Sequence, residues 1–175
     1  MSQIRTNSLV PAGGIPAGAS GGGIIQIVST TKVDAASTTS STYSDITGLS
    51  LNITPRSTSN KVLVIFHTNH GHTGSSSTTA FRILRGGVDI AKGTYAGYGT
   101  GATSGGRISQ ADGGNASQWS MTHLDSPATT SATTYKIQWA TQGSTAYLNR
   151  AGDSSASGLD RVTSVSSITL MEVSG

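Results

Sequence analysis

The sequence predicts an all-β protein, an antiparallel jelly-roll-like β-sandwich of about eight strands with an extended N-terminal arm. Short apolar segments recur from Ile24 to Val173, separated by clusters of Gly, Ser, Thr and Asn. No segment shows the 3.6-residue apolar period of an amphipathic helix. We therefore divide the chain into an arm, residues 1–23, and a jelly-roll β-sandwich domain, residues 24–175.

The arm carries isolated apolar residues between prolines and glycines. Pro11 and Pro16 restrict the backbone and the glycines free it, so this segment cannot build a core alone. We expect it to be extended and to become ordered only against a partner surface. The apolar side chains that would anchor it there are Ile4, Leu9, Val10 and Ile15.

The domain contains alternating and continuous apolar runs. The runs at residues 61–66 and 167–173 are apolar on both faces, which predicts central strands. Gly86 and Gly87 separate two apolar segments and suit a tight two-residue hairpin. The other predicted strands are Ile24–Val28, Leu49–Ile53, Phe81–Leu84, Val88–Ile90, Trp119–Leu124, Tyr135–Trp139 and Tyr147–Leu148. The predicted core is Leu49, Leu51, Ile53, Val62, Val64, Phe66, Ile83, Trp119, Ile137, Trp139 and Leu170.

Composition indicates association with other protein chains. Only 11% of the 175 residues are charged and 34% are hydrophobic, so a single small β domain would be marginal alone. We expect it to form an oligomer. The arginines occur singly, without the basic cluster that follows a phosphate backbone, so we do not expect nucleic-acid binding. No apolar stretch approaches the roughly 18 residues of a membrane span. The N-terminus also lacks a secretory apolar region, and we expect synthesis in the cytoplasm.

Two histidines lie two residues apart after a predicted central strand. On an extended chain His70 and His72 point the same way. Around a three-fold axis, three such pairs would offer six imidazoles to one octahedral Fe, Ni or Zn ion, as in the His-x-His sites at the tips of some phage fibres. The alternative is a polar loop whose histidines face water or bond to the backbone. Apart from this ion, we expect no cofactor.

Catalysis is not expected from this sequence. Serines are abundant, but none lies in the G-x-S-x-G setting of a nucleophile elbow. The alternative is a glycan-degrading spike with a carboxylate pair. This sequence, however, contains no insert that would form a groove for the glycan. We expect a flexible loop that contains Tyr95, Tyr98 and the glycines at 97, 99, 101, 105 and 106, because these glycines lack the spacing of a phosphate loop. Its tyrosines either contact a receptor, as in adaptable binding surfaces, or serve as ordinary loop residues.

Several segments together resemble a known group of proteins. They are the opening MSQIRTNSLVPAGG, the run IIQIVSTTKVDAASTTSSTYSDITGLSLNITPRSTSNKVLV, and the segments FRILRGG, HLDSPATTSATTYKIQW and SSITLMEV. These resemble small virion structural proteins of tailed bacteriophages, many from marine and cyanobacterial phages. The resemblance implies a jelly-roll module that assembles as a homotrimer, is located in the virion and has no catalytic residues.

Two locations in the virion follow from the resemblance. As a capsid decoration protein, of the cement or head fibre type, the trimer would attach to the major capsid protein through its arms. As a short tail fibre or fibre-tip protein, the arm would insert into tail proteins and the loops would contact a host receptor such as a surface glycan. The chain has no shaft repeats, which favours decoration. A lectin-like receptor binder without turnover is a further class that the sequence leaves open.

Overall fold

The protein is all-β, as predicted. The computed structural model describes residues 23–74, 77–94, 101–108, 116–152 and 163–175. Among these residues there is no helix that is long and apolar enough to cross a membrane. The strands are β1 (Ile24–Lys32), β2 (Ala36–Thr38), β3 (Ser44–Ile53), β4 (Lys61–His72), β5 (Ser77–Arg85), β6 (Val88–Ile90), β7 (Ser104–Ile108), β8 (Ala116–Asp125), β9 (Thr133–Gln142), β10 (Ala146–Leu148) and β11 (Ser166–Val173).

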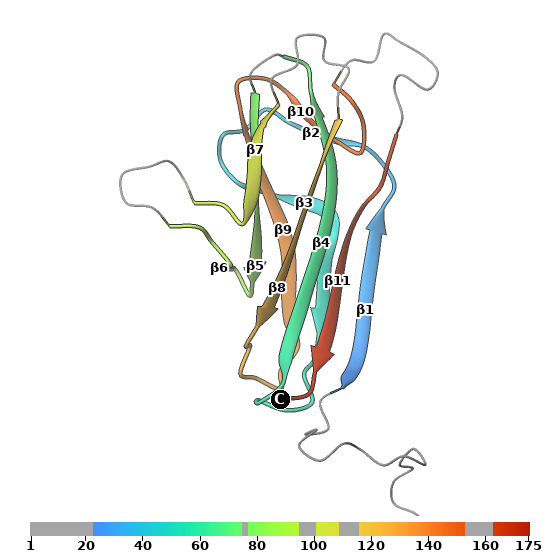
Figure 1. Cartoon of the computed structure of the whole chain (residues 1–175), viewed down its shortest axis with the longest axis vertical. Helices are drawn as coiled ribbons and strands as arrows, with labels where there is room; N and C mark the ends of the chain where they lie inside the picture. Colours follow the sequence, from blue (N-terminus) through green and yellow to red (C-terminus); the bar gives the residue numbers. More distant parts are fainter. Residues whose placement is uncertain (1–22, 75–76, 95–100, 109–115, 153–162) are drawn as a thin grey trace, which may run out of the picture.

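The strands form two antiparallel layers that pack face to face (Figure 1). One layer has the order β1-β11-β4-β8, and the short β10 and β2 extend β4 at its upper end. The other has the order β3-β9-β5, with β6 and β7 both pairing with β5. The antiparallel β-sandwich is therefore confirmed. The layer of β1, β11, β4 and β8 faces the layer of β3, β9, β5 and β7.

Alternate residues of each strand fill the space between the layers. On β4, Val62, Val64 and Phe66 are fully buried, while the residues between them are partly exposed on the outer face. Of the predicted core, Leu51 and Trp119 are partly buried against the cluster and the rest are buried. The sequence interpretation missed Phe81, Tyr135, Leu148 and Ile168, which are also fully buried. Alternation thus predicts which face of a strand is inside.

The main strand predictions are confirmed, and one loop prediction is wrong. β4 and β11 are both central strands, and Gly86 and Gly87 form the two-residue β5–β6 turn with φ angles of 55° and 90°. Gly105 and Gly106, expected in a flexible loop, lie in β7. A Cβ on Gly106 would lie 2.2 Å from the Trp119 ring, so glycine is required for close packing of β7 on β8.

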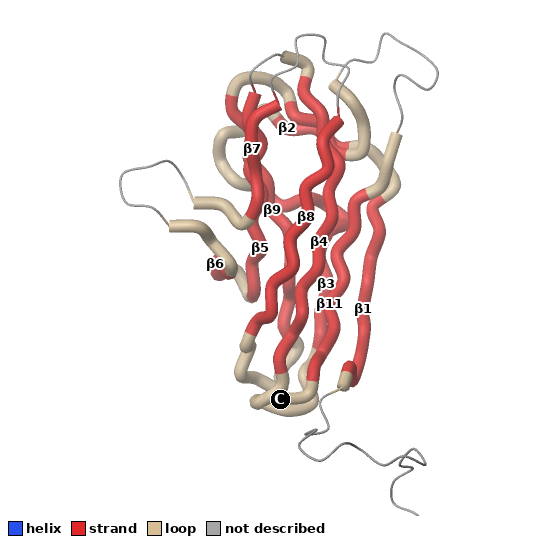
Figure 2. The backbone as a smooth tube through the Cα atoms, in the orientation of Figure 1, coloured by secondary structure: helices blue, strands red, loops and turns tan. Residues whose placement is uncertain are grey.

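Both ends of the sandwich consist of loops and turns, as Figure 2 shows. At the lower end, Asp125 accepts hydrogen bonds from Arg85 Nη1 at 2.7 and 2.8 Å and from the Tyr135 hydroxyl at 2.6 Å. This carboxylate ties β8 to β5 and β9 in the opposite layer. The described chain also begins at this end, where the Ser174 amide donates to the Gly23 carbonyl at 3.0 Å.

Replacing Asp125 with alanine should destabilise the domain by about 2 kcal/mol, because it leaves the Tyr135 hydroxyl and the Arg85 guanidinium without their shared acceptor. The Asp125 side chain is 8% exposed and that of Arg85 is 30% exposed. Urea denaturation measures the loss. Asp45→Ala is the matched control, since that carboxylate also pairs with a cation, Lys136, but is 53% exposed. It should cost less than about 1 kcal/mol. Equal losses in the two variants would contradict this role for Asp125.

Candidate functional site

Two groups of predicted site residues lie outside the described residues. They are the arm anchors Ile4, Leu9, Val10 and Ile15, and the loop tyrosines Tyr95 and Tyr98. The described chain shows where each segment attaches. The arm joins at Gly23, beside the C-terminus. The tyrosine loop is closed at its base by a hydrogen bond from the Gly93 amide to the Ala102 carbonyl at 3.0 Å.

His70 and His72 both point inward, between the two layers. The same-side orientation predicted for them is confirmed, but they belong to β4 and are 0% and 2% exposed. Their ring centroids are 5.6 Å apart, and His72 Nε2 hydrogen-bonds with the Thr79 hydroxyl of β5 at 2.8 Å. Neither ring nitrogen of His70 has a well-oriented hydrogen-bond partner among the described residues. The polar-loop interpretation is therefore wrong.

This placement does not fit a metal ion shared on a three-fold axis. An imidazole that ligates such an ion must reach the subunit surface, and these rings are enclosed within one domain. Among the described residues, no group of three or more His, Cys, Asp or Glu side chains is arranged to hold a metal. A substrate also has no access to the hydrogen-bonded pair of His72 and Thr79, because Thr79 is fully buried.

The outer face of the β1-β11-β4-β8 layer carries an exposed apolar row. Directly paired positions on the four strands align four large side chains, which we call the apolar row: Ile27, Met171, Leu63 and Leu124. Ile27 and Leu124, at the ends of the row, are 56% and 53% exposed. Ile24, at 58%, lies one row below. Contiguous exposed apolar side chains are typical of a contact surface.

Neutral side chains surround the apolar row. The next paired row consists of Ser29, Thr169, Ile65 and Thr122. The row above that one consists of Thr31, Ser167, His67 and Ser120. Among the outward positions of these four described strands, Lys61 at the lower margin is the only lysine, arginine or carboxylate. This face therefore combines apolar and hydroxyl groups with almost no charge.

The outer face of the opposite layer is different, because a polar network covers it. Asp45 of β3 accepts a hydrogen bond from Lys136 Nζ of β9 at 2.8 Å. Arg82 of β5 donates to Gln138 at 2.7 and 2.9 Å and to Asp89 at 2.9 Å. Hydrogen bonds from Lys136 and Gln138, together with the positive charge of Lys136, lower the pKa of the Asp45 carboxyl. The two outer faces are thus chemically distinct, one nearly uncharged and one ionic.

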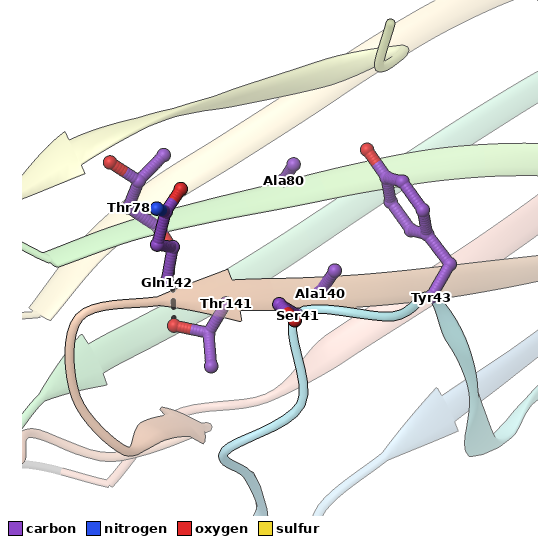
Figure 3. Close-up of a pocket in the computed structure, with 7 residues that line it drawn as sticks. All are labelled: Ser41, Tyr43, Thr78, Ala80, Ala140, Thr141 and Gln142. Carbon is purple, nitrogen blue, oxygen red and sulfur yellow. Dashed lines mark hydrogen bonds between the residues drawn. The ribbon is translucent and has the colours of Figure 1, made fainter. Parts of the chain in front are cut away.

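A shallow groove lies beside this network (Figure 3). Ala80 of β5 and Ala140 of β9 are directly paired and form its floor. Tyr43 stands at one end, and Thr78 and Gln142 line the other (Figure 3). The groove has a volume of about 190 Å³. No residue pattern in the sequence indicated it, because the floor depends on which alanines of two distant strands are paired.

No known protein family matches this chain, and no curated protein is significantly similar to it in sequence.

The buried position of His70 predicts acid sensitivity. Burial, reinforced by the neighbouring His72, lowers the pKa of His70 to about 3, whereas histidine in an unfolded chain protonates near pH 6.5. Protons therefore bind the unfolded chain first. The free energy of unfolding should fall as the pH drops from about 6.5 towards 3, by up to about 5 kcal/mol from this residue. Chemical denaturation at a series of pH values measures the fall.

Two variants separate His70 from the carboxylates that also titrate in this range. His70→Phe keeps an aromatic ring against Phe81 and Trp119 and should remove a large part of the fall. His67→Gln, on the outer face of the same strand, should retain it. A pH profile that is unchanged in His70→Phe would show that His70 is not the cause.

Proposed function

We propose that this chain is a bacteriophage virion structural protein, a homotrimeric capsid decoration protein of the cement or head fibre type. Its N-terminal arm attaches it to the major capsid protein. The observation that supports this proposal best is the apolar row on the outer face of the β1-β11-β4-β8 layer. An oligomer needs such a surface, and the exposed fractions of Ile27 and Leu124 show that a single copy leaves it uncovered.

The occupant of this face is another copy of the same chain. In a symmetric oligomer, side chains near the axis meet their own counterparts, so a charged residue there would face the same charge. The outward positions around the apolar row largely avoid this penalty, since their polar groups are hydroxyls, amides and one imidazole, with Lys61 at the lower margin as the single charge among the described positions. The ionic outer face of β3, β9 and β5 would bring like charges together in the same arrangement. Three copies that turn their apolar rows towards one axis leave their ionic faces outside.

The arm begins where it can reach neighbouring subunits. It joins β1 at Gly23, at the lower end of the sandwich and next to Ile24, which lies one row below Ile27. If extended, residues 1–23 would span up to roughly 80 Å. Three arms on one trimer would bind with avidity, because each bound arm raises the effective concentration of the next. This arrangement suits a protein that ties capsid subunits together.

A second candidate function is a short tail fibre or fibre-tip protein that contacts a host receptor. The groove beside Tyr43 favours it, because this groove opens on the ionic outer face that a trimer of this kind would leave exposed. The fold and the arm serve either location in the virion, and the two locations differ in the number of copies that a particle holds.

The apolar row predicts how the oligomer can be broken. The double variant Ile27→Asp, Leu124→Asp should be a monomer, because each symmetric contact would bury several carboxylates without partners. The wild-type chain should have the mass of a trimer. Sedimentation equilibrium measures both masses. Val88→Asp is the control, since Val88 is 64% exposed on β6 of the opposite layer, and it should remain trimeric. A wild-type monomer, or a trimeric double variant, would overturn this interface.

Copy number decides between the two locations. Quantitative mass spectrometry of purified particles, relative to the major capsid subunit, should find hundreds of copies for a decoration protein. A few to some tens of copies would indicate the tail, and none would overturn a virion role. Deletion of residues 2–20 should leave a folded trimer that no longer joins particles. If the truncated protein decorates particles normally, the arm is not the attachment.

A further inference from the structure

The groove on the outer face of β3, β9 and β5 has the chemistry of a binding site. Two neighbouring outward-facing pairs between β5 and β9 differ in character along the groove. The pair Ala80 and Ala140 gives an apolar floor, and the next outward-facing pair, Thr78 and Gln142, gives a hydroxyl and an amide. Both of these polar residues are exposed to solvent. A flat apolar floor beside paired polar groups suits a ligand that is itself apolar on its face and polar at its edge.

Tyr43 is held in place at the other end of the groove. The Arg82 guanidinium lies 4.2 Å from the centre of the Tyr43 ring, in a cation–π contact. The Tyr43 hydroxyl donates a hydrogen bond to the Gly101 carbonyl at 3.4 Å. Arg82 is itself fixed by hydrogen bonds to Gln138 and Asp89. The aromatic wall is therefore oriented before any ligand arrives, which lowers the entropic cost of binding.

Size and charge narrow the class of ligand. The volume of about 190 Å³ is below the roughly 300–1,000 Å³ of sites for drug-sized molecules, so it matches a single ring. Among the described residues, those that line the groove include no carboxylate, lysine or arginine. Of the neighbouring arginines, Arg82 already pairs with Asp89. Arg107, the partner of Thr78 on β7, is exposed to solvent. An extended peptide is disfavoured, because the groove lies on a sheet face where backbone groups pair within the sheet.

We propose that this groove binds one pyranose ring of a neutral saccharide. The C–H face of the sugar lies on the Ala80 and Ala140 methyl groups and against the Tyr43 ring, and its hydroxyl groups bond to Thr78 and Gln142. This inference goes beyond the proposed decoration role, and it gives the second candidate function a receptor site. It requires neither the apolar row nor the arm.

The test uses the full-length protein and six neutral probes. These are the α- and β-methyl glycosides of D-glucose, D-galactose and D-mannose, and binding is followed by saturation-transfer NMR and by titration of amide chemical shifts. At least one probe should bind with millimolar affinity and shift the amides of Thr78, Ala80 and Gln142. Absence of binding by all six at tens of millimolar would overturn the proposal. Binding of methyl glucuronide or glucose 6-phosphate alone would also overturn it, since the ligand would then be charged.

Two variants should locate the site. Ala80→Leu fills the floor and should weaken binding about tenfold or more, and Gln142→Ala should weaken it several-fold because one amide partner is lost. Thr134→Ala, elsewhere on the outer face of β9, is the matched control and should bind like the wild type. Unchanged binding in Ala80→Leu would overturn the assignment of the site.

A further variant separates this inference from the proposed function. The Ile27→Asp, Leu124→Asp protein changes the opposite outer face, so it should bind the same glycoside with the affinity of the wild type. Loss of binding in that variant would overturn the proposal that one copy holds a complete site. Sedimentation then reports on the oligomer and NMR reports on the groove, and each hypothesis can fail alone.

Discussion

The alternation of β4 is the constraint on which the rest of this structure depends. This strand pairs with β8 on one side and, on the other, with β11 along its lower part and β10 at its upper end. Its inward residues Val62, Val64 and Phe66 form the centre of the core. Its outward residues Leu63 and Ile65 lie on the surface between two other strands. A shift of one residue in its register would exchange the two sets and destroy both the core and the apolar row.

The same strand changes character along its length. Its lower half places aliphatic and aromatic groups in the core, whereas its upper half places His70 and His72 there. Burying imidazole nitrogens without partners opposes folding. Contacts of His70 with Phe81 and Trp119, and the hydrogen bond of His72 with Thr79, offset part of this cost. At the lower end, the ion pair of Asp125 and Arg85 joins the two layers. The apolar core therefore lies between two sets of buried polar groups, the histidines above and this ion pair below.

The two outer faces show how one small domain can serve two kinds of contact. The nearly uncharged face can meet copies of itself without strong like-charge repulsion. The opposite face carries the charged network of Asp45, Lys136 and Arg82, which favours contact with water. The groove lies on that ionic face, where no contact between copies would cover it. Separation of the self-association surface from the ligand surface lets each be changed without loss of the other.

Local patterns in the sequence predict the all-β class, the β5–β6 hairpin, most of the core and all strands except the short β2 and β7, because alternation and glycine pairs act locally. It also placed His70 and His72 on one side of their strand. That this side is the interior follows from the packing of the two layers, which no local pattern specifies. The apolar row and the groove arise from the registers of strands that are distant in sequence, and local patterns do not specify register between such strands. Likewise, the need for glycine at position 106 of β7 comes from the Trp119 ring that packs against it, a contact that no local pattern contains.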